Sequence, residues 1–176
     1  RYGDRRQYQG EGRMYTGNSG RVNVWETNFV PDIGTFTTFS WKERGAGGSS
    51  VAFEFADNTQ GAHVSQFPVG TYKKAHQHGP GAHVVIISGV GYSLLWPPGG
   101  RVPEDVIRVD WKRGGMVVPP NNWFHQHFNG GNEPARYLAF RWNSQKYRFS
   151  LGAPMEGEMD VSVKLGGTQI EYEDED

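Results

Sequence analysis

The chain of 176 residues contains no cysteine, which excludes disulfide bonds, thiolate metal ligands and a thiol nucleophile. It also lacks any apolar run near the roughly 18 residues that a membrane helix needs. The net charge is −1, so no excess of either sign predicts binding to nucleic acid or to a membrane surface. The first residues are basic without the apolar segment of a signal peptide, and we expect a cytoplasmic protein.

Helical periodicity is missing as well, because glycine and proline interrupt most of the chain at short intervals. The sequence has 25 Gly and 10 Pro, together with six Trp, eight Tyr and ten Phe. Short runs of β-branched and aromatic residues between turn residues are typical of strands. The composition therefore predicts an all-β sandwich or jelly-roll barrel, and the length is that of a single domain.

Three regions differ in composition. Residues 1–20 are polar and glycine-rich, and we expect a flexible N-terminal arm there. Strand-like sequence fills residues 21–150, which we predict to form one barrel with additional strands at its N-terminal side. Residues 151–176 form a weaker C-terminal segment that ends in an acidic run, which we interpret as a solvated tail.

Two pairs of histidines stand out within the barrel region. His76 and His78 flank one residue, as do His125 and His127, and both pairs lie in strand-like sequence. Residues i and i+2 of a strand project to the same face, so each pair directs two imidazoles into one space. Converging imidazoles predict a bound first-row transition metal.

The spacing around these histidines resembles the two motifs of the cupin superfamily, G-x5-H-x-H-x3,4-E-x6-G and G-x5-P-x-G-x2-H-x3-N. The matching positions are Gly70, His76, His78 and Gly89 in the first motif, and Gly114, Pro120, His125 and Asn129 in the second. Asn122 replaces a motif glycine, and asparagine tolerates the same left-handed turn. The resemblance covers residues 68–142 and implies a cupin jelly-roll β-barrel with a divalent metal on His76, His78 and His125.

The glutamate of the first motif is absent. Counting back from Gly89 puts Ala82 in its position, whereas counting forward from His78 puts His83 there and makes it a fourth metal ligand. We favour Ala82, which leaves a site of three neutral histidines, and keep His83 as the alternative. Three such ligands leave about three positions of an octahedral ion open, enough for a bidentate substrate and dioxygen.

With Ala82 in place, the motifs resemble those of gentisate-type dioxygenases, which have H-x-H-x-P-x-A and a later W-H-D-H. That resemblance implies non-haem Fe(II), with His127 acting as an acid or base beside the metal. Mn, Ni and Zn also suit histidine ligands. Those enzymes contain two cupin domains, whereas this chain has room for one.

Further residues are candidates for substrate binding. Tyr72 and Lys74 share the strand parity of His76, which predicts that they point inward. Arg141, like Arg136, could hold a substrate carboxylate, and Trp123 is expected in the pocket wall.

The leading hypothesis is an Fe(II) dioxygenase that acts on a small organic substrate, aromatic or diketone-like, together with O2. The alternatives are a Mn, Ni or Zn cupin that acts as a Lewis acid (a decarboxylase, isomerase or lyase) and a non-enzymatic sensor that binds a small ligand. The family resemblance further implies a homodimer.

Overall fold

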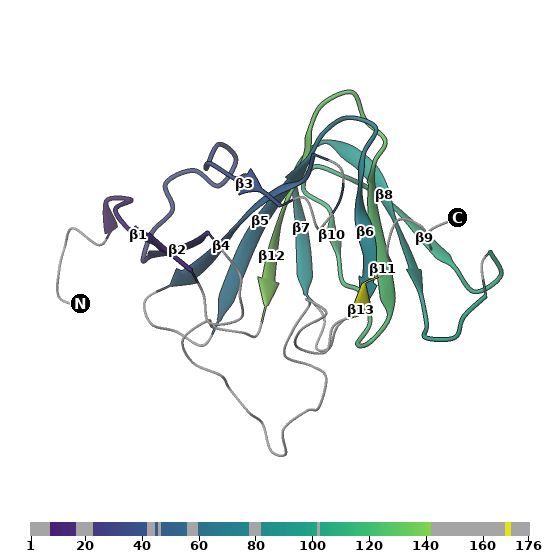
Figure 1. Ribbon diagram of the computed structural model, residues 1–176. Helices are drawn as coiled ribbons and strands as arrows, with labels where there is room; N and C mark the ends of the chain where they lie inside the picture. Colours follow the sequence, from purple (N-terminus) through teal and green to yellow (C-terminus); the bar gives the residue numbers. More distant parts are fainter. Residues whose placement is uncertain are drawn as a thin grey trace, which may run out of the picture.

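The computed structural model describes residues 8–16, 23–41, 45, 47–55, 60–77, 82–101, 103–141 and 168–169. Within them the chain forms thirteen strands in two sheets that face each other (Figure 1). The prediction of an all-β jelly-roll barrel is confirmed. No helix in this part of the chain is both long enough and apolar enough to cross a membrane.

The sheets are of unequal size. The larger contains β1 (Arg13–Tyr15), β2 (Val24–Thr27), β4 (Ser49–Phe55), β5 (Gly61–Phe67), β12 (Ala135–Arg141), β7 (His83–Ser88) and β10 (Met116–Val117) in that spatial order, with β3 (Phe39–Ser40) paired to β4. The smaller contains β13 (Thr168–Gln169), β6 (Tyr72–Gln77), β11 (Phe124–Asn129), β8 (Val90–Trp96) and β9 (Ile107–Lys112). The pair β2–β4 is parallel, and the other pairs among these strands are antiparallel.

The barrel interior is filled by alternate residues of both sheets. On β7, Val84 and Ile86 are buried whereas the alternating residues Val85 and Ile87 are only half-buried. Such alternation is expected where one face of a sheet meets the core. The buried cluster consists of Phe67, Ala82, Val84, Ile86, Leu95, Trp111, Val117, Ala135, Tyr137 and Ala139.

An N-terminal extension covers the outer face of β4 and β5. A second buried cluster, built on Val51, Phe53 and Val64, is packed by aromatic side chains that include Trp25 and Phe36. Within residues 1–20, where we expect a flexible arm, Arg13–Tyr15 form β1, which pairs with β2. An ion pair between Arg13 Nε and Glu26 Oε2, at 2.5 Å, accompanies this pairing, although the polar composition of the segment favoured disorder.

Two turn positions of the second motif adopt the left-handed backbone conformation. Gly114 has φ = 83° and Asn122 has φ = 60°. Asparagine is among the few residues that reach this region at low cost. The expectation that Asn122 can stand in for the motif glycine is confirmed.

Asn129, the last residue of the second motif, joins two turns at one end of the barrel. It is buried, and its side chain bonds to four backbone groups: Nδ2 donates to the carbonyl oxygens of Phe67 (3.3 Å), Pro68 (2.9 Å) and Glu133 (2.8 Å), and Oδ1 accepts from the Gly131 amide (3.0 Å). These bonds connect the turn after β5 to the turn after β11.

We expect Asn129→Ala to lower the free energy of unfolding by about 2 to 4 kcal/mol, because buried backbone groups lose their partners. Urea unfolding measures the change. Asn132→Ala is the matched control, since Asn132 is exposed in the same turn. Equal effects of the two substitutions would show that Asn129 does not hold the turns together.

Candidate metal centre

The register between β6 and β11 determines which side chains share the barrel interior. His125 lies opposite His76, but His127 lies opposite Lys73, so β6 carries one more residue than β11 over this stretch. An extra residue of this kind is a β-bulge, which breaks the strict alternation of faces along the bulged strand. His76 and Lys73 therefore lie opposite the inward-facing His125 and His127, although strict alternation would put residues three apart on opposite faces.

His76 and His125 converge in the interior. They are 8% and 2% exposed, and their ring centroids lie 4.3 Å apart. Nδ1 of His76 lies 2.8 Å from the Lys74 carbonyl oxygen, and Nδ1 of His125 lies 3.1 Å from the Trp123 carbonyl oxygen. A carbonyl can only accept, so both Nδ1 atoms carry a proton, and in the neutral form of each ring the lone pair is on Nε2.

This arrangement fits a divalent metal. Histidine ligands commonly donate one ring N–H to a backbone carbonyl, which orients the ring and leaves the other nitrogen for the ion. Within the described ranges no cluster of three or more His, Cys, Asp or Glu residues could hold a metal. His76 and His125 thus supply two candidate ligands. The predicted third ligand, His78, lies outside the described residues.

His127 faces the same interior but differs in its surroundings. It is 3% exposed, and its ring centroid lies 5.6 Å from that of His125 and 5.4 Å from that of Tyr137. Its Nδ1 lies 2.7 Å from a hydroxyl, Ser93 Oγ. Burial lowers the pKa of His127 well below its usual 6.5, and the nearby His125 and Lys73 lower it further. His127 is therefore neutral at physiological pH.

The position of the missing glutamate is occupied by Ala82. Ala82 is buried in the core cluster of the interior. His83, the next residue, is exposed and pairs in register with Phe140, whose side chain is also exposed. Successive strand residues point to opposite faces, so the alternative in which His83 is a fourth ligand is contradicted.

The inward orientation predicted for Tyr72 is wrong, because parity with His76 is lost across the bulge. Tyr72 lies opposite Phe128, and the two ring centroids are 5.5 Å apart. Phe128 in turn stacks on Tyr92 at 4.7 Å. Phe128 alternates with His127 along β11, so this aromatic row lies on the outer face of the sheet. Lys74 lies within the bulge itself and is buried.

The remaining predicted residues are placed as follows. Trp123 is half-buried against the core cluster, consistent with a wall, and its carbonyl orients His125. Arg141 ends β12 opposite Gly61, and its side chain lies outside the described residues. Arg136 does not reach the histidines, because its guanidinium donates to the Phe36 carbonyl in the N-terminal extension and to Gln66 on β5.

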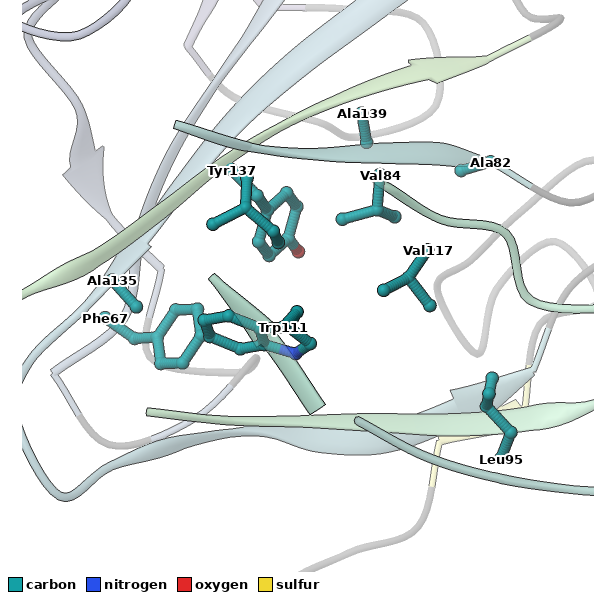
Figure 2. Close-up of a cluster of buried hydrophobic side chains, with 10 residues drawn as sticks. Phe67, Ala82, Val84, Leu95, Trp111, Val117, Ala135, Tyr137 and Ala139 are labelled. Carbon is teal, nitrogen blue, oxygen red and sulfur yellow. The ribbon is translucent and has the colours of Figure 1, made fainter. Parts of the chain in front are cut away.

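Four residues near the histidines were not predicted from the sequence: Lys73, Ser93, Trp111 and Tyr137. Figure 2 shows Tyr137 of β12 and Trp111 of β9 reaching into the space between the two sheets. Strand alternation would place Ser93 on the same face as Leu95, which is buried. No sequence signal marks the bulge that brings Lys73 opposite His127.

The lowered pKa of His127 predicts a pH-dependent stability. Below about pH 6.5 the unfolded chain binds a proton at this residue and the folded protein does not, so stability present above that pH is lost as pH falls. The slope from this residue is at most about 1.4 kcal/mol per pH unit. We expect His127→Gln to flatten the fall in unfolding free energy between about pH 7 and about pH 5.5 in chelator-treated protein.

Urea unfolding at several pH values measures this slope. His83→Gln is the control, because it removes an exposed histidine from β7 in the other sheet. An unchanged slope in His127→Gln would show that His127 is not held neutral by the fold.

Comparison with known proteins gives structural matches alone: no family model and no curated protein sequence matches the chain. An oxalate decarboxylase from Lactobacillus farciminis, solved with formate, is similar at 16% identity over 61% of this chain and 31% of that one, with a TM-score of 0.50. The chain therefore spans less than a third of that enzyme's length.

Two further structures are similar. A cupin-2 domain protein of Rhodospirillum rubrum has 15% identity over 59% of this chain and 66% of that one, with a TM-score of 0.48. CapF, solved with the inhibitor 3-isopropenyl-tropolone, has 16% identity over 60% of this chain and 30% of that one, with a TM-score of 0.49. With the sheet topology described above, the match to the decarboxylase shows that the chain has the cupin fold.

Proposed function

We propose that the chain is a metal-dependent cupin enzyme whose ion is held by His76, His125 and His78. The observation that carries the proposal is the pair of Nδ1–H···O=C bonds of His76 and His125. Each bond leaves the ring's lone pair on Nε2, as a neutral metal ligand requires.

The reaction that we favour is Fe(II)-dependent oxygenation of a small organic substrate with two adjacent oxygen donors. Ala82 is buried where the cupin motif has a glutamate, so the first motif adds no carboxylate to the histidines. A site of neutral ligands keeps the full charge of the ion, which supplies Lewis acidity and electron transfer when bound. The core cluster includes Tyr137, which lies beside His127, and its apolar and aromatic character favours an aromatic or diketone substrate.

His127 acts on the substrate in this proposal rather than on the ion. Its Nδ1 is bonded to Ser93 instead of a carbonyl, which separates it from the two ligand histidines. The neighbouring Lys73 is buried opposite it in the register and adds positive charge. Both features favour an anionic substrate oxygen near His127.

A second candidate is Lewis-acid catalysis without oxygen, such as decarboxylation. It is favoured by the structural similarity to an oxalate decarboxylase. The same histidines would serve, with Mn, Ni or Zn as the ion.

Metal retention tests the ligand assignment. We expect His76→Ala and His125→Ala to lose stoichiometric metal after loading with Fe(II), Mn(II) or Zn(II), because each loses an Nε2 donor. His127→Ala and His83→Ala should keep it. Metal analysis after desalting measures the content, and loss of metal from His127→Ala would overturn the assignment.

Oxygen uptake separates the two reaction classes. We expect Fe(II)-loaded protein, prepared anaerobically, to consume O2 with at least one of a panel of catechols, hydroxybenzoates and diketones. His127→Ala should retain iron and lose turnover. Tight Mn(II) binding without any O2 uptake would contradict the oxygenase and favour the Lewis-acid reaction.

A further inference from the structure

We propose that Trp111 and Ser93 are positioning residues that hold His127 in the tautomer protonated on Nε2, so that His127 presents an N–H donor to an oxygen of the bound substrate. The substrate part rests on the proposed function, whereas the tautomer is a property of the fold alone. The chemical class that such a donor recognises is an anionic oxygen, of a carboxylate or an enolate.

Trp111, Ser93 and His127 form a buried chain of hydrogen bonds. The indole Nε1 of Trp111 donates to Ser93 Oγ at 3.0 Å, and Ser93 Oγ lies 2.7 Å from Nδ1 of His127. Ser93 is 0% exposed. The three residues come from adjacent strands, with Ser93 directly opposite His127 in the β8–β11 register.

Which atom donates in each of these hydrogen bonds follows from the chemistry of the indole and the hydroxyl. An indole N–H can only donate, so Ser93 Oγ accepts from Trp111. The Ser93 proton then needs an acceptor, and within the described part of the chain Nδ1 of His127 is the acceptor within hydrogen-bond distance. Leaving a buried hydroxyl proton unbonded costs about 1 to 3 kcal/mol. Nδ1 therefore carries the lone pair, and Nε2 carries the proton.

Gly91 makes this arrangement possible. It pairs with Trp111 between β8 and β9, and a Cβ at this position would clash with the Phe128 carbonyl oxygen and lie 2.6 Å from the indole ring. A larger residue would therefore disturb both the backbone of β11 and the indole. The glycine two residues before Ser93 thus sets the position of the donor that orients Ser93.

The consequence is a functional division among neighbouring histidines. Backbone carbonyls hold His76 and His125 as the Nδ1–H tautomer, and a serine hydroxyl holds His127 as the opposite one. Because its lone pair is already bonded to Ser93, His127 is neither a metal ligand nor a base. It donates a hydrogen bond, which narrows the acid or base role that the family resemblance implies.

The tautomers can be measured without any metal or substrate. We expect long-range proton–nitrogen correlation spectra of isotope-labelled, metal-free protein to show His127 protonated on Nε2 only, and His76 and His125 protonated on Nδ1 only. The set of imidazole signals that disappears in His127→Gln is assigned to His127. Protonation of His127 on Nδ1 in the wild-type protein would overturn the proposal.

Substitutions test the role of Ser93. Ser93→Ala should leave His127 as a mixture of tautomers, whereas Ser93→Thr, which keeps the hydroxyl, should preserve the single form. Ser50→Ala is the matched control, because Ser50 is a buried serine that bonds the Val64 carbonyl. A single unchanged tautomer in folded Ser93→Ala would contradict the positioning role, and Trp111→Phe tests the tryptophan in the same way.

Binding of oxalate, a small dicarboxylate, to zinc-loaded protein tests the donor. We expect Ser93→Ala to bind oxalate about ten-fold more weakly than wild type and Ser50→Ala to bind it equally, since a hydrogen bond to a charged group is lost. Equal affinity in Ser93→Ala would overturn the donor role. If zinc-loaded wild-type protein does not bind oxalate, both the donor role of His127 and the metal site are contradicted. The tautomer measurement would still decide whether Ser93 positions His127.

Discussion

One extra residue in β6 is the constraint on which the candidate site depends. The bulge opposite His125 and His127 keeps His76 facing the barrel interior while it brings Lys73 opposite His127 and sends Tyr72 to the outer face. It also places the Lys74 carbonyl within 2.8 Å of His76 Nδ1. An unbulged strand would carry its side chains in strict alternation, and the residue opposite His127 would then be Lys74 instead of Lys73.

The interior histidines are distinguished by what touches Nδ1. A carbonyl can only accept, whereas a hydroxyl that already accepts from an indole must donate, so two chemically identical rings on β11 carry opposite tautomers. In the function that we propose, the backbone prepares His125 to bind a cation, and the Trp111–Ser93 pair prepares His127 to contact an anion. Burial enforces the difference, because it lowers the pKa of His127 and keeps that ring neutral.

Motif spacing was enough to predict the fold, the convergence of His76 with His125, the left-handed turn at Asn122 and the interior position of Ala82. These features depend on local backbone conformation and on strand alternation, both of which can be inferred from residue types and their spacing. Strand alternation gave the wrong orientation for Tyr72, because a bulge interrupts β6. That bulge arises where β6 pairs with β11, which is distant in the sequence. Ser93 and Trp111 were not predicted for the same reason: they meet His127 only through cross-strand register.

In the proposed metal centre, His76 and His125 bind one ion through Nε2. X-ray absorption spectroscopy of the zinc-loaded protein tests it most directly, because the scattering pattern of imidazole rings around zinc can be counted. We expect three imidazoles around zinc, from His76, His125 and His78, and one fewer in His125→Ala. A zinc environment without imidazole scattering, or one that is unchanged in His125→Ala, would contradict it.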